Sequence, residues 1–172
     1  AGPGEYQLLA LLQQKTDQEP HLIPRYDSLP ISDYLAPGLI LPYRSSIGCY
    51  WGKCFFCPEK VEATSYAPIP PEKAAIDLRG LASTMKPALV HLVDNAISPA
   101  LMQAMCDEPP GAPWYGFARI TEHLTDPAFC IALKQSGCVM LKLGLESGNQ
   151  GVLDALHKGI DLEAASMALQ NL

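Results

Sequence analysis

From Leu39 onward, short apolar runs alternate with stretches of helical periodicity, and this alternation restricts the fold more than any other feature of the sequence. The expected strands are Leu39–Ser45, Ala88–Asp94, Trp114–Arg119 and Cys138–Glu146. The expected helices are Pro70–Met85, Ser98–Glu108, Thr125–Gly137, Asn149–Gly159 and Asp161–Leu172. Alternation of this kind predicts an α/β fold whose parallel strands are joined by right-handed crossovers.

Two architectures agree with this order of elements. The first is a partial (β/α) barrel, similar to a TIM barrel truncated to about four βα units. The second is a doubly wound open sheet. Because the last expected helix leads to no further strand, we expect the truncated or open barrel and keep the doubly wound sheet as the alternative.

The segment before Leu39 has a different character. We expect residues 1–38 to form a linker or N-terminal extension, with a short amphipathic helix at Glu5–Gln14. Four prolines then keep the chain extended, at positions 20, 24, 30 and 37. Residues 39–172 form the expected core domain, which we interpret as C-terminally incomplete. Because the chain begins with Ala, we expect it to be a fragment of a longer protein.

Charge and hydropathy narrow the class of protein. The formal net charge is −6, which argues against nucleic acid bound through a broad basic face. No apolar run approaches the about 20 residues that span a bilayer. The first residues lack the basic start and apolar core of a signal peptide, so we expect a cytoplasmic protein without a membrane partner.

Three of the six cysteines lie within nine residues, in the stretch GCYWGKCFFCPE. Cys49, Cys54 and Cys57 have the spacing C-x4-C-x2-C, whereas the other three are scattered and read as small buried apolar residues. Thiolates bind zinc, copper and iron–sulfur clusters. A structural zinc site takes four ligands, and a lone histidine such as His91 is an uncertain fourth one. Three cysteines on a four-iron cluster would leave one iron open for a further ligand.

Ligands of α/β barrels and open sheets bind at the carboxyl ends of the strands. The side chains that directly follow the expected strands are therefore candidates for a binding site. Besides the cysteine loop, they are Asp94, Asn95, Arg119, Glu146 and Ser147.

The cysteine loop resembles the cluster motif of the radical S-adenosylmethionine (radical SAM) enzymes. Members most often carry C-x3-C-x2-C with an aromatic residue before the third cysteine, which is the place of Phe56. This chain has one residue more between Cys49 and Cys54. A second likeness is LKLGLESGNQGVLDALHKGI (Leu141–Ile160), which is similar to the family's fourth strand and the following helix. HLVDNAISP (His91–Pro99) stands where many members have a Gly-Gly-Glu segment. The loop is most similar to the subgroup that often carries an upstream cobalamin-binding domain.

The resemblance implies a [4Fe-4S] cluster held by the three cysteines and a bound S-adenosylmethionine (SAM). It implies that Phe56 lies beside the adenine, or else is an ordinary core residue. It implies that Glu146 accepts hydrogen bonds from the ribose hydroxyls and that Ser147 faces the cofactor, or else that both belong to the start of the following helix. Asp94 with Asn95 would hold the SAM ammonium, or else form a turn. Arg119 would pair with the SAM carboxylate, or else form a structural ion pair with Glu122 or Glu146. No residue is assigned to catalysis.

The expected function is therefore reductive cleavage of SAM to drive radical chemistry, with cobalamin-dependent methyl transfer as one form of it. The resemblance implies a small-molecule or peptide substrate and a reductant such as flavodoxin or ferredoxin. Any cobalamin would be held by a domain outside this chain. The alternatives are an iron–sulfur electron carrier, a zinc-binding module, and an enzyme similar to the tRNA methylthiotransferases.

Overall fold

The computed structural model describes residues 11, 23–26, 28–62 and 65–172. A four-stranded parallel sheet has the order β1-β4-β5-β6, so its neighbours follow the order of the chain. These strands are β1 (Ile40–Tyr43), β4 (Leu89–Ile97), β5 (Trp114–Ala118) and β6 (Cys138–Leu143). The expected helix at Glu5–Gln14 lies outside the described residues apart from Leu11.

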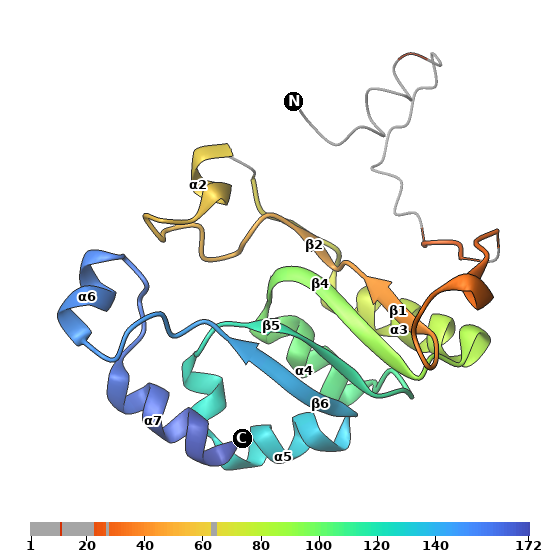
Figure 1. The fold of residues 1–172 in the computed structure, drawn as a ribbon. Helices are drawn as coiled ribbons and strands as arrows, with labels where there is room; N and C mark the ends of the chain where they lie inside the picture. The colour runs from red at the N-terminus through yellow and green to blue at the C-terminus, as the bar shows by residue number, and fades with distance from the viewer. Residues whose placement is uncertain (1–10, 12–22, 27, 63–64) are drawn as a thin grey trace.

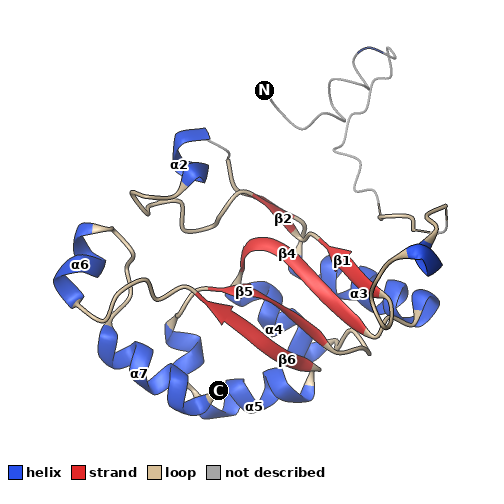
Figure 2. Cartoon of the chain, viewed as in Figure 1, coloured by secondary structure: helices blue, strands red, loops and turns tan. Residues whose placement is uncertain are grey.

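The helices that cross between the strands lie on one side of the sheet, as Figures 1 and 2 show. The α-helices are α2 (Pro58–Glu62), α3 (Pro71–Met85), α4 (Pro99–Asp107), α5 (Pro127–Gln135), α6 (Gln150–Ala155) and α7 (Leu162–Asn171). A doubly wound sheet would reverse its strand order and carry helices on both faces. The consecutive order and the single helical layer therefore confirm the α/β fold of a partial (β/α) barrel.

The core lies between the sheet and this helical layer. Leu92 and Trp114 have no exposed surface and point toward the helices, as does Tyr43 at 1 % exposure. On the opposite, concave face of the sheet, Val93 and Phe117 keep 40 % and 46 % of their surfaces exposed. Because successive strand residues point to opposite faces, this contrast shows that helices cover only one face among the described residues.

The predicted helix starts are confirmed by their caps. The Ser98 side chain accepts a hydrogen bond from Leu101 N, and Pro99 occupies the first helical position of α4. Asp126 caps α5 and Asp161 caps α7 in the same way, each accepting from a backbone N–H of the first turn. These side chains satisfy N–H groups that have no partner inside the helix.

Several details of the elements differ from the prediction. β4 continues through Ile97, beyond the expected end at Asp94. The helix after β6 ends at Ala155, because His157 and Gly159 adopt left-handed backbone angles of φ 53° and 62°. A short antiparallel ribbon of β2 (Ser46–Ile47) and β3 (Ala67–Pro68) was not predicted.

The described part of the N-terminal segment lies against the start of β1. It contains a 3-10 helix, η1 (Ile31–Asp33), and Tyr26 donates its hydroxyl proton to Pro42 O. Between Tyr26, Tyr34 and Ile40 lies a cavity of about 530 Å³, on the side of β1 away from the cysteine loop. The assignment of residues 1–38 to a separate linker stays a prediction.

Candidate functional site

The three clustered cysteines lie on the loop that joins β2 to α2. Gly48 and Gly52 take left-handed angles of φ 72° and 62° there, which let the loop turn tightly. Cys54 is buried at 8 % exposure, whereas Cys49 and Cys57 are half-buried. All three are free thiols. Both neighbouring elements are short, so the position of the loop depends on contacts with more distant parts of the chain.

Arg119 makes one of these distant contacts. It follows β5 directly, is 7 % exposed, and donates from Nη1 to Cys54 Sγ at 3.9 Å. Its Nη2 donates to the carbonyl oxygen of Lys158. The guanidinium carbon lies 4.2 Å from the centre of the Trp51 ring, in the geometry of a cation–π contact. Arg119 therefore joins the cysteine loop to the turn that follows α6.

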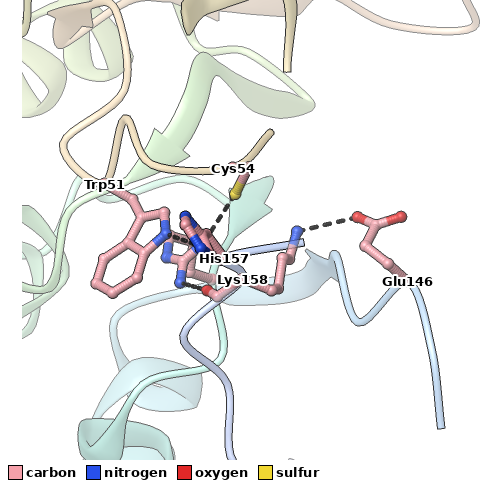
Figure 3. Close-up of polar contacts among 6 residues, drawn as sticks. Trp51, Cys54, Glu146, His157 and Lys158 are labelled. Carbon is pink, nitrogen blue, oxygen red and sulfur yellow. Dashed lines mark hydrogen bonds and ion pairs between the residues drawn. The ribbon is translucent and has the colours of Figure 1, made fainter. Parts of the chain in front are cut away.

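Trp51 makes a second contact with the same turn. Its Nε1 donates to His157 O at 3.0 Å, as Figure 3 shows. A Cβ added to Gly159 would overlap the indole ring, so the ring occupies the space that a side chain would fill. Phe55 adds to the contact: its N–H donates to Leu156 O at 3.1 Å, and its ring lies 4.0 Å from that of His157. The turn at 156–159 is thus the surface on which the cysteine loop rests.

Lys158 and Glu146 form an ion pair beside this turn. Lys158 Nζ lies 3.0 Å from Glu146 Oε1, and the Lys158 side chain is 8 % exposed while that of Glu146 is 40 % exposed (Figure 3). The same ammonium group lies 5.4 Å from the centre of the Phe56 ring. Glu146 has a left-handed backbone angle of φ 73°. The site thus brings together Phe56 and Glu146, and it adds Lys158, which the sequence analysis missed.

Asp94 is held in a different way. It lies inside β4 at 2 % exposure, and its carboxylate accepts from Ser45 N, Ser45 Oγ and Ser46 Oγ at 3.2, 2.8 and 2.6 Å. The neighbouring Asn95 is exposed on the opposite face of the strand. Asp94 therefore fixes the segment that follows β1 and leads to the cysteine loop, and the alternative that it forms a turn with Asn95 is wrong.

Ser147 lies beyond the end of β6 and is half-buried. Its hydroxyl accepts from Asn149 N at 3.1 Å, while Asn149 itself caps α6 by accepting from Val152 N. Ser147 thus shapes the approach to the helix. The predicted ion pairs of Arg119 with Glu122 or Glu146 are replaced by its contacts with Cys54 and Lys158 O.

The residues present can be compared with the needs of a metal. Within the described ranges, no three His, Cys, Asp or Glu side chains gather closely enough to hold one metal ion, and this includes His91. A four-iron cluster has a different requirement, because each cysteine ligates a different iron. Three free thiols on one loop can supply one sulfur ligand to each of three irons, and Arg119 donates a hydrogen bond to one of these sulfurs. The chemistry of the residues fits such a cluster.

The fold places this chain in the class of proteins built on a partial (β/α) barrel, and the side chains described above lie near the carboxyl ends of its strands. No protein-family model and no curated protein matches the chain. Similar solved structures include three forms of one protein, the cobalamin-dependent S-adenosylmethionine radical enzyme OxsB.

The likeness to OxsB is one of fold. The form with aqua-cobalamin has a TM-score of 0.57 at 18% identity over 76% of this chain. The form with aqua-cobalamin and SAM has 0.57 at 19% over 77%. The selenomethionine-labelled apo form has 0.58 at 18% over 77%. In each case the chain spans 22% of the length of OxsB. Among the described residues, no helix combines the length and apolarity needed to cross a bilayer.

Proposed function

We propose that this chain is part of the core of a radical SAM enzyme and that Cys49, Cys54 and Cys57 hold a [4Fe-4S] cluster. The observation that carries the proposal is the position of three free thiols on one loop at the carboxyl ends of a partial barrel. The fold likeness to a radical SAM enzyme supports the same class. When bound, the cluster would supply the electron for reductive cleavage of SAM.

The other side chains of the site would bind and orient SAM. Glu146 can accept hydrogen bonds from ribose hydroxyls through the carboxylate oxygen that Lys158 leaves free. Phe56, 51 % exposed, offers a ring face to the adenine. Asn95 is the more accessible partner for the SAM amino group, because the Asp94 carboxylate is already engaged by two serines.

Substrate and reductant are also part of the proposal. We expect a small-molecule or peptide substrate, because the acidic balance offers no broad electrostatic attraction for nucleic acid. A flavodoxin or ferredoxin would supply the electron. The fold likeness to a cobalamin-dependent enzyme supports a cobalamin-dependent reaction, with cobalamin bound by another domain. Methyl transfer in a cytoplasmic protein is the form of this reaction that we expect.

Anaerobic reconstitution with iron and sulfide tests this function. We expect about four irons per chain, a brown four-iron absorbance spectrum, and an EPR spectrum of the reduced protein that changes on adding SAM. The single variants Cys49→Ala and Cys57→Ala should lose the cluster. Cys106→Ala is the matched control, since Cys106 is also half-buried but lies on α4.

The outcomes separate the alternatives. Reduced protein whose EPR spectrum does not respond to SAM, and which forms no 5′-deoxyadenosine, would be an iron–sulfur carrier. Colourless protein that retains one zinc ion would be a zinc-binding module. Loss of iron in Cys106→Ala to the same extent as in Cys49→Ala would contradict the assignment of the ligands.

A further inference from the structure

The spacer between Cys49 and Cys54, residues 50–53, is one residue longer than in the motif that the loop resembles. Trp51 lies in this spacer and reaches the turn after α6, 106 residues away in sequence. We propose that Trp51 and Arg119 are positioning residues that hold Cys54 ready for the cluster, and that the longer spacer serves this contact. The inference rests on the proposed function for its role in the loaded protein.

The guanidinium group of Arg119 is enclosed on several sides. One nitrogen donates to Cys54 Sγ, the other terminal nitrogen donates to Lys158 O, and the indole of Trp51 covers its face. At 7 % exposure, the group has little surface left for another partner. A bidentate pair with a carboxylate needs two parallel N–H groups on an accessible edge. The structure thus assigns Arg119 to the thiol of Cys54, and not to the carboxylate of SAM.

The indole ring of Trp51 lies against residues 157–159, which we call the seat of Trp51. The space that the ring fills exists only because residue 159 is a glycine. At position 159 the backbone angle of φ 62° favours glycine, and any Cβ there would overlap the indole. The hydrogen bond from Trp51 Nε1 to His157 O sets the orientation of the ring in this seat. Because the ring lies on Arg119, the seat also fixes the guanidinium beside Cys54. Gly159 therefore affects the burial of Cys54 through the side chains of Trp51 and Arg119.

The arrangement has a consequence for a bound cluster. A donor directed at a ligating sulfur stabilises the more negative, reduced state of the cluster and raises its reduction potential. Arg119 supplies such a donor from a buried position, where the interaction is stronger than in water. Removal of this donor is therefore expected to make the potential more negative.

The first test uses the cluster-free protein and measures the rate at which iodoacetamide alkylates each cysteine. In Trp51→Ala and in Gly159→Ala we expect Cys54 to react about tenfold faster, which corresponds to about 1.4 kcal/mol of lost protection. Trp51→Phe, which keeps a ring but loses the N–H donor, should lie between these variants and the wild type. Cys106, on α4, serves as the internal reference.

A matched control separates loss of the seat from backbone strain. Gly111 has a similar left-handed angle of φ 78°, and a Cβ added there would meet no atom within 4 Å. Gly111→Ala should leave the reactivity of Cys54 unchanged. If Trp51→Ala and Gly159→Ala fold with the wild-type circular dichroism spectrum and Cys54 is still protected as in the wild type, the positioning role is wrong.

The second test measures the reduction potential of the loaded protein without SAM. Arg119→Gln should shift it to a more negative value, and Arg119→Lys should shift it less because the positive charge is kept. An unchanged potential together with weaker SAM binding would instead make Arg119 the partner of the SAM carboxylate and overturn the inference. If the wild type takes up no cluster, the proposed function fails, while the alkylation rates still decide whether Trp51 positions Cys54.

Discussion

At the scale of single residues, the ion pair of Lys158 with Glu146 is asymmetric, because only the lysine is buried. Removing Glu146 leaves a buried ammonium without its carboxylate, which is costly in a region of low dielectric. Removing Lys158 leaves a carboxylate that water can still reach. Loss of Glu146 should therefore lower the free energy of unfolding more than loss of Lys158.

We predict that Glu146→Gln lowers the free energy of unfolding by about 1–3 kcal/mol. Lys158→Met, which keeps most of the volume of the side chain, should cost less than Glu146→Gln. Urea denaturation of both variants and the wild type measures the difference. Equal losses in the two variants would contradict the asymmetry of the pair.

His91 gives a pH dependence with a defined sign. Burial, and secondly the charge of Lys142, lower the pKa of His91 below its ordinary value, and the imidazole stacks on Tyr115 with ring centres 4.4 Å apart. The unfolded chain therefore binds a proton at this residue more readily than the folded chain does. Stability from this residue is retained above the unfolded pKa of about 6.5 and falls as the pH drops below it.

We predict that the wild-type free energy of unfolding decreases between pH 7.5 and 5.5, and that Lys142→Met flattens this decrease by raising the pKa of His91. Urea denaturation at several pH values gives the slope, and NMR titration of the His91 ring gives its pKa directly. A His91 resonance that titrates at the same pH in the wild type and in Lys142→Met would contradict the electrostatic cause.

The residues of the site could be predicted only in part. The cysteine loop, Arg119 and Glu146 follow directly from the rule that strand ends line the site, because position after a strand can be read from the chain. The roles of Trp51 and Lys158 could not be read in this way. Trp51 contacts His157 across 106 residues, and no local pattern of residues encodes such a contact. Whether the predicted residues bind the cluster and SAM stays a prediction.

At the scale of elements, the helix starts expected at Ser98 and Asp161 agree with the structure, where both residues cap their helices, whereas strand ends were less accurate. Asp94 resembles a residue after a strand because it is charged, yet it lies within β4 since Ser45 and Ser46 satisfy its carboxylate. The β2–β3 ribbon has only two residues in each strand, too few for a periodic pattern. The boundary of an element could therefore be predicted where one local side chain sets it, as at the capped helix starts. It could not be predicted where contacts with residues distant in sequence set it, as at the end of β4.

Substitution of alanine for glycine should change the stability of the fold in opposite directions at two positions. A Cβ on Gly116 in β5 would lie 2.7 Å from Ile97 Cδ1 and 2.8 Å from Leu92 O, so Gly116→Ala should cost about 1–3 kcal/mol. A Cβ on Gly80 in α3 would meet nothing within 4 Å, so Gly80→Ala should stabilise by about 0.5–1 kcal/mol. Thermal and urea unfolding measure both, and a Gly116→Ala protein as stable as the wild type would contradict the close approach of β4 and β5.

At the scale of the whole molecule, the alternation of strands and helices predicted parallel strands but left the order of the strands open. The consecutive order β1-β4-β5-β6 became clear only from the pairing. The outer strands β1 and β6 each have one edge that pairs with no other strand among the described residues. An open edge with apolar side chains is a template for pairing with another chain.

We predict that the isolated chain associates with itself through β6, where Val139 is 62 % exposed and Met140 is 45 % exposed. Sedimentation velocity from micromolar to millimolar concentration should show species larger than the monomer. Val139→Lys should shift the association to higher concentration, because a charge on the edge opposes pairing. A single monomeric species throughout this range would contradict the prediction.

The consecutive order of the strands also bears on the timing of synthesis. Each strand of the parallel sheet can pair with the strand of that sheet made before it, whereas the seat of Trp51 at 157–159 is made after all four of these strands. At about 5–20 residues per second, the cysteine loop waits roughly 5–20 s on the ribosome for this seat. During that interval, nothing yet made at residues 157–159 protects Cys54, so the thiol stays accessible until the loop closes on this turn. Alkylation of ribosome-stalled chains should therefore find Cys54 reactive when the exposed chain ends before residue 157, and protected when it extends to Leu172.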